Sequence, residues 1–105
     1  MKLKEKLKLI IDDLKKYNPE KIVLFGSAAR GDTDEYSDID LLVIKDDVDK
    51  GFIDREVEVI TYIRPELRPV DIFVYTKDEL EKMKKNLNTF IEEALKCGKV
   101  IYEKT

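Results

Sequence analysis

The sequence contains no histidine, no tryptophan and a single cysteine, Cys97. One cysteine cannot form a disulfide within the chain, and without histidine there is neither a Ser-His-Asp triad nor a cysteine–histidine zinc site. Any metal ion must therefore be held by carboxylates, which favours hard ions such as Mg²⁺ or Mn²⁺. We interpret Cys97, at the end of a helical pattern, as a small, partly buried apolar residue.

The sequence also lacks any apolar run close to the length of a membrane span. Met1 is followed by alternating lysine and leucine, which is typical of a helix and not of a signal peptide. We therefore expect a cytoplasmic protein with no membrane association. The formal net charge is −3, whereas proteins that bind a nucleic acid backbone are usually basic, so nucleic acid is not an expected partner.

The chain has 105 residues, of which 43% are apolar and 41% charged. This length suits one small domain over residues 1–105, and the apolar share is too high for a disordered chain. Apolar side chains recur at helical spacing in 2–17, and short apolar runs bounded by turn residues predict strands. Residues 52–63 hold strand formers at helical spacing, and we favour a helix there. The pattern predicts a small sheet flanked by helices, with strands at 21–25, 38–44, 70–75 and 100–102 and helices at 2–17, 52–63, from 77, and 87–96.

An Asp-x-Asp pair opens the second predicted strand. Residues two apart on a strand point to the same face, so the Cα atoms of Asp38 and Asp40 should lie roughly 6.5 to 7 Å apart. Two bare carboxylates about 5 Å apart repel by roughly 3 kcal/mol at an effective dielectric of 20. Asp32, Asp34 and Glu35 crowd the same segment. A bound cation would explain this cluster, although the pair alone also fits a solvated strand entrance.

Gly26 and Ser27 follow the first predicted strand directly. Glycine lets the main chain approach a ligand closely, and the amides that open the next helical turn, with the serine hydroxyl, can hold phosphate oxygens. Ser27 is also suited to cap an ordinary helical turn over 28–30, which is the simpler explanation when the two residues are taken alone.

The combination of these features is more specific than either feature alone. Ten residues separate Ser27 from Asp38, so a triphosphate at the first motif would have its metal ions at the second. A third acid, Asp71, lies within the apolar run Val70–Val74. A carboxylate inside an apolar run is costly unless it is paired or metal-bound, whereas an exposed position at a strand entrance has no such cost.

These motifs, from Gly26 to Gly31, from Ser37 to Leu41 and at Asp71, resemble those of the DNA polymerase β-like nucleotidyltransferase superfamily. Within it the chain looks like the minimal nucleotidyltransferases, the MntA-type antitoxins that pair with HEPN-domain toxins. The resemblance covers nearly the whole chain. It implies an α/β (α+β) nucleotidyltransferase fold with a mixed sheet, two Mg²⁺ ions and ATP as the substrate.

The resemblance also implies a role for each motif residue. Asp38 and Asp40 would hold both metal ions, and Asp71 would help to bind the catalytic ion and accept a proton. Gly26 and Ser27 would hold the β and γ phosphates. Arg30, in the same motif, would either add charge stabilisation or form a structural salt bridge.

Little of the chain lies outside the catalytic motifs, so we expect a partner protein to present the acceptor, and the resemblance implies that this acceptor is a tyrosine hydroxyl of a HEPN-domain toxin. Two alternatives stay open at this point. The protein could be a non-catalytic antitoxin that blocks its toxin sterically, although three clustered acids are unnecessary for a pure binder. It could also be a nucleotidyltransferase for a small molecule such as an aminoglycoside, although no substrate domain is evident.

Overall fold

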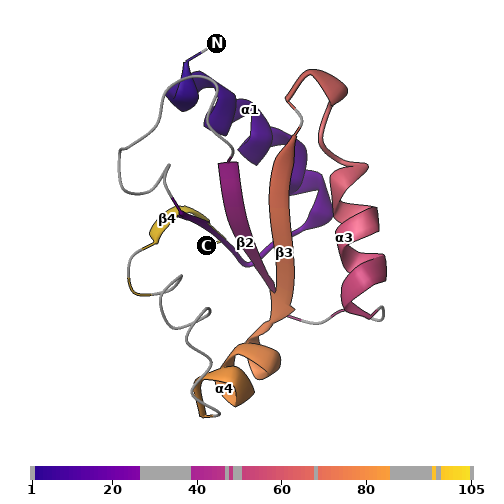
Figure 1. The fold of residues 1–105 in the computed structure, drawn as a ribbon, viewed down its shortest axis with the longest axis vertical. Helices are drawn as coiled ribbons and strands as arrows, with labels where there is room; N and C mark the ends of the chain where they lie inside the picture. The colour runs from indigo at the N-terminus through magenta and orange to yellow at the C-terminus, as the bar shows by residue number, and fades with distance from the viewer. Residues whose placement is uncertain are drawn as a thin grey trace.

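The described part of the chain is built on a mixed four-stranded sheet (Figure 1). The computed structural model describes residues 2–26, 39–46, 48, 51–67, 69–85, 96 and 98–104. The strand order is β3-β2-β1-β4, in which β2 is parallel to β3 and β1 is antiparallel to both of its neighbours. The predicted α/β fold with a mixed sheet is confirmed, and the strands are β1 (Lys21–Phe25), β2 (Ile39–Lys45), β3 (Val70–Thr76) and β4 (Lys99–Glu103).

The helices flank this sheet largely where the sequence predicts them. The first helix is shorter than expected, because its last turn tightens into a 3-10 helix and Asn18 then adopts a left-handed φ of 60°. The predicted helix at 87–96 lies outside the described residues, apart from Lys96. The described helices are α1 (Leu3–Leu14), η1 (Lys15–Tyr17), α3 (Phe52–Ile60), η2 (Pro65–Leu67) and α4 (Lys77–Lys85). In this part of the chain, no helix combines the length and apolar content needed to cross a bilayer.

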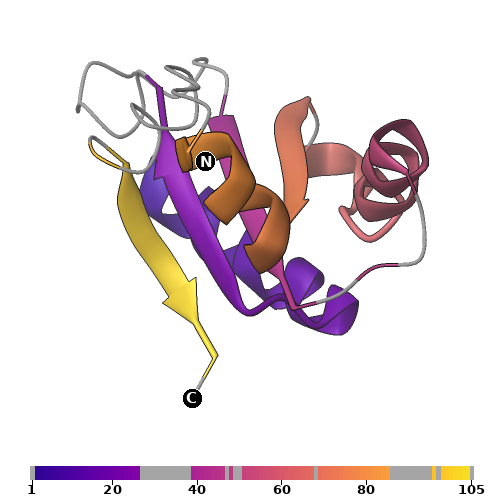
Figure 2. The ribbon, with the colours of Figure 1, turned by 90° about the horizontal axis from the view of Figure 1, so that it is seen from below.

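Each face of the sheet buries its own set of apolar side chains. The first face packs against α1 and α3, and the second packs against α4 through Leu80. Figure 2 shows α1 and α4 on opposite sides of the sheet. β1 is covered on both faces, since Ile22 and Leu24 belong to the first core and Val23 to the second. The other buried strand residues of the first core are Ile39, Leu41, Val43, Val70, Ile72 and Val74.

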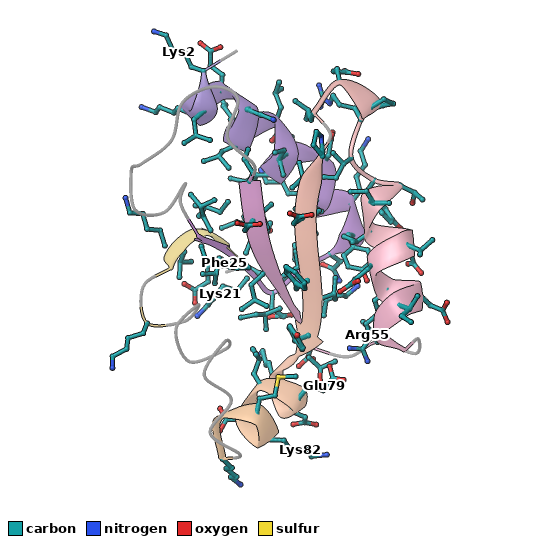
Figure 3. All side chains as sticks on the ribbon, in the orientation of Figure 1. Lys2, Lys21, Phe25, Arg55, Glu79 and Lys82 are labelled. Atoms are coloured by element: carbon teal, nitrogen blue, oxygen red, sulfur yellow. The ribbon has the colours of Figure 1, made fainter. Side chains whose placement is uncertain are left out.

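The start of α4 is fixed by a reciprocal cap. The Glu79 amide donates to the Thr76 hydroxyl at 3.2 Å, and the Thr76 amide donates to Glu79 Oε1 at 2.8 Å. Arg55, buried on α3, donates to the same Oε1 at 2.7 Å (Figure 3). Burial alone would raise the pKa of Glu79, but these hydrogen bonds hold it below its usual range. This cap links the end of β3 to both α3 and α4, at the start of the helix that the sequence predicts from 77.

A second ion pair joins α1 to the segment that leads into β3. Asp13 is 7% exposed, and its carboxylate accepts from Arg64 Nη2 at 2.7 Å, from Nε at 3.0 Å and from the backbone amide at 3.0 Å. The side-chain hydrogen bond from Arg64 holds the pKa of Asp13 below its usual range, against the effect of burial. The pair anchors the chain shortly before Leu67 enters the core.

Replacing Asp13 with asparagine should destabilise the fold by about 2 kcal/mol at pH 7, the scale of a lost hydrogen bond to a charged group. Because the folded-state pKa is lowered, the contribution is complete above the unfolded value of about 4 and is lost as pH falls through the folded value. Urea unfolding at pH 7 and pH 3 measures both effects. Asp12→Asn is the matched control, since Asp12 is 53% exposed beside Lys15 and its loss should cost under about 0.5 kcal/mol. Equal costs for the two variants at pH 7 would contradict this.

Candidate active site

Two carboxylates lie side by side at one end of the second face of the sheet. Asp40 on β2 pairs in register with Asp71 on β3 and, on its other side, with Phe25 on β1. Residues directly paired across strands share a face, and their neighbours Ile39 and Val70 point into the opposite core. Because adjacent strands are about 4.8 Å apart, both acids can reach one ligand in front of the sheet.

Gly26 brings the main chain after β1 against the same carboxylate. Its φ is +75°, in the left-handed region that side chains other than glycine rarely adopt. A Cβ added at Gly26 would also collide with the Asp40 carboxylate. The left-handed φ therefore favours glycine at this position, and the close contact shows that the Asp40 carboxylate lies against the main chain there. Gly26, at the start of the predicted phosphate-binding turn, therefore lies next to Asp40, a predicted metal ligand.

The remaining predicted site residues, Asp38, Ser27 and Arg30, lie outside the described residues. Within the described ranges no group of three or more His, Cys, Asp or Glu side chains is gathered as a metal site. Asp40 and Asp71 are two of the three predicted ligands, and the strand pairing brings these two together. Their carboxylate oxygens suit a hard divalent cation, so the residues present fit the implied Mg²⁺.

Asp71 is exposed, so it is not the buried carboxylate that its position in an apolar run could also suggest. Along β3, buried residues alternate with more exposed ones, and Asp71 is exposed at the second position. The apolar run around it therefore does not make its charge costly, and the alternative of an exposed strand entrance is the one observed. The metal-binding role of Asp71 stays a prediction, supported by its pairing with Asp40.

Sequence reasoning missed an aromatic pair beside the two acids. The rings of Phe25 and Phe73 have centroids 6.0 Å apart and are tilted by 46°. Both side chains are partly exposed and pack against the second core, formed by Val23, Leu42, Ile44 and Leu80. A signal was present in the sequence, because Phe73 is two residues after Asp71 on a strand and must share its face.

Comparison with known proteins gives concordant findings. The family model described as "Polymerase beta, Nucleotidyltransferase" matches residues 5–105. A Methanocaldococcus jannaschii protein named "Putative protein adenylyltransferase" is 36% identical over 83 residues, covering 79% of this chain and 78% of that protein. A second protein of that organism, with the same description, is 62% identical over 34 residues, covering 32% of this chain and 23% of its own length. The crystal structure of a "putative nucleotidyltransferase from Sulfolobus solfataricus" shares the fold, with a TM-score of 0.65, 24% identity, and coverage of 95% of this chain and 79% of that one.

Proposed function

Because the chain belongs to the polymerase β nucleotidyltransferase family and is a nucleotidyltransferase, we propose that it transfers AMP from ATP to a tyrosine hydroxyl of a partner protein, a HEPN-domain toxin. The observation that carries this proposal is the in-register pairing of Asp40 with Asp71, beside a glycine whose missing Cβ leaves room for the Asp40 carboxylate. The description of two relatives as protein adenylyltransferases supports a protein acceptor over a small molecule.

The nucleotide would lie in front of the second face of the sheet. Asp40 and Asp71, with Asp38, would hold two Mg²⁺ ions, which when bound stabilise charge on the attacking and leaving oxygens. Gly26 and Ser27 would receive the β and γ phosphates, since the main chain turns away from β1 at that point with a left-handed φ. In this proposal the phosphate end of ATP would lie on the β1 side and the acceptor on the β3 side.

The acceptor hydroxyl would approach Asp71. A tyrosine hydroxyl has a pKa near 10 and is almost wholly protonated at pH 7, so it must lose its proton as it attacks the α-phosphorus. Asp71 is an exposed residue on the outer strand of the described sheet, and its carboxylate would accept that proton. The new bond joins the tyrosine oxygen to the α-phosphorus, and pyrophosphate leaves with the electron pair of the broken P–O bond.

Mass spectrometry of a purified HEPN-domain protein, after incubation with this protein, ATP and Mg²⁺, tests the proposal. We expect one AMP added on a tyrosine and loss of the toxin's activity. Asp40→Asn is the matched inactive variant and should give no modified partner. If the wild-type protein neutralises the toxin while no nucleotide is attached, the protein acts by steric binding and the proposal is wrong.

A further inference from the structure

We propose that Phe25 and Phe73 form the nucleobase subsite, an aromatic surface on which the base of the bound nucleotide stacks. This inference rests on the proposed function, because it requires the phosphate chain of the nucleotide to lie at Asp40 and Asp71. It adds a binding contact that neither the metal ligands nor the phosphate-binding turn supplies.

The aromatic pair borders the carboxylate pair on two sides. Phe25 is the cross-strand partner of Asp40, and Phe73 follows Asp71 by two residues on the same face, roughly 7 Å along the strand. The rings approach each other across β2. Phe73 pairs in register with Leu42, which lies two residues after Asp40 on β2. A nucleotide whose α-phosphate lies at the acids therefore has an aromatic surface within reach of its sugar and base.

The packing beneath the rings makes this surface rigid. Leu42 and Leu80 are buried in the second core, and both phenylalanines pack against that core while staying partly exposed. A ring held by such packing loses little conformational freedom when a ligand contacts its exposed part. A flat, apolar ligand that covered the exposed part of these rings would bury further aromatic surface.

Stacking predicts a particular pattern of ligand affinity. Base–aromatic stacking contributes about 1 to 3 kcal/mol per base and tolerates different bases, because every base has a π face. The rings should therefore strengthen the binding of ATP and of GTP alike. They should contribute nothing to inorganic tripolyphosphate, which carries the phosphates and no base.

Calorimetry with Mg²⁺ can separate these two parts of the ligand. Phe73→Leu and Phe25→Leu keep an apolar side chain and remove the ring, and each should weaken ATP binding about tenfold while leaving tripolyphosphate affinity unchanged. Phe73→Tyr should restore ATP affinity because it restores the ring. Tyr75→Leu is the matched control, since Tyr75 lies on the same face of β3 and packs on the same core, two residues further from Asp71. It should change neither affinity.

Two results would overturn the nucleobase subsite. An equal loss of ATP and tripolyphosphate affinity would mean that the rings support the Asp40 carboxylate and do not contact the base. Unchanged affinity for both ligands would mean that the rings do not touch the nucleotide. Failure of the proposed function would give another result. The wild-type protein would bind ATP with the predicted dependence on Phe73, but it would attach no AMP to the partner.

Discussion

Replacing Asp71 with asparagine should lower AMP transfer at least about a thousandfold while ATP affinity changes by no more than about threefold. Loss of a positioned base costs roughly 10² to 10⁴ in rate, and weaker binding of the catalytic ion adds to that loss. ATP would keep its contacts on the β1 side, where Gly26 and Asp40 lie together. Single-turnover transfer measured by mass spectrometry, together with calorimetry of ATP binding, gives both quantities.

Stability provides a second readout for the same variant. Asp71 lies beside Asp40 with both side chains on one face, so removal of one negative charge relieves repulsion when no metal is bound. The metal-free melting temperature of Asp71→Asn should therefore be no lower than that of the wild type. Asp54→Asn, an exposed acid on α3, is the control and should transfer AMP at the wild-type rate. If Asp71→Asn also transfers at the wild-type rate, the role assigned to Asp71 is wrong, although the enzyme class stands.

The positions of the described strands and helices could be predicted because local chemistry determines them. Apolar runs bounded by turn residues identify β1 and β3, and the Thr76–Glu79 pair marks the start of α4 before any tertiary contact is known. The end of α1 was less accessible. Its last turn is a 3-10 helix, Lys15–Tyr17, and the left-handed Asn18 follows it, whereas the helical spacing of apolar residues in 2–17 predicts one continuous helix.

The assembly of the site could be predicted only in part. The alternation of side chains along a strand puts Asp71 and Phe73 on one face, but nothing local to either strand specifies that Asp71 pairs with Asp40. That register depends on the parallel pairing of two strands separated by α3. The proximity of Gly26 to Asp40 likewise depends on antiparallel pairing of β1 with β2. The sequence motif indicated a glycine close to a ligand, and the structure adds a carboxylate that occupies the space of its missing Cβ.

Replacing Gly26 with alanine should both destabilise the fold and lower AMP transfer about a hundredfold. A left-handed φ costs a residue with a Cβ about 1 to 2 kcal/mol, and the Asp40 carboxylate must also move away from the new Cβ, so we expect a loss of about 2 kcal/mol. The transfer rate falls because a displaced Asp40 carboxylate misplaces the nucleotide, and displacement by about 1 Å can cost 10²-fold. Urea unfolding and the transfer assay measure the two effects.

A double-mutant cycle separates the collision from the backbone strain. In an Asp40→Ala background the carboxylate is gone, so Gly26→Ala should then cost only the strain of the left-handed φ, and the difference between the two backgrounds should be about 1 kcal/mol. Gly51→Ala is the matched control, because its φ is −70° and a Cβ there meets no atom within 4 Å. Gly51 is the N-cap residue of α3, so that change should cost under about 1 kcal/mol. If Gly26→Ala costs the same with and without the Asp40 carboxylate, the two groups are not in contact in solution. The inference that the phosphate-binding turn lies directly against the metal ligand would then be wrong.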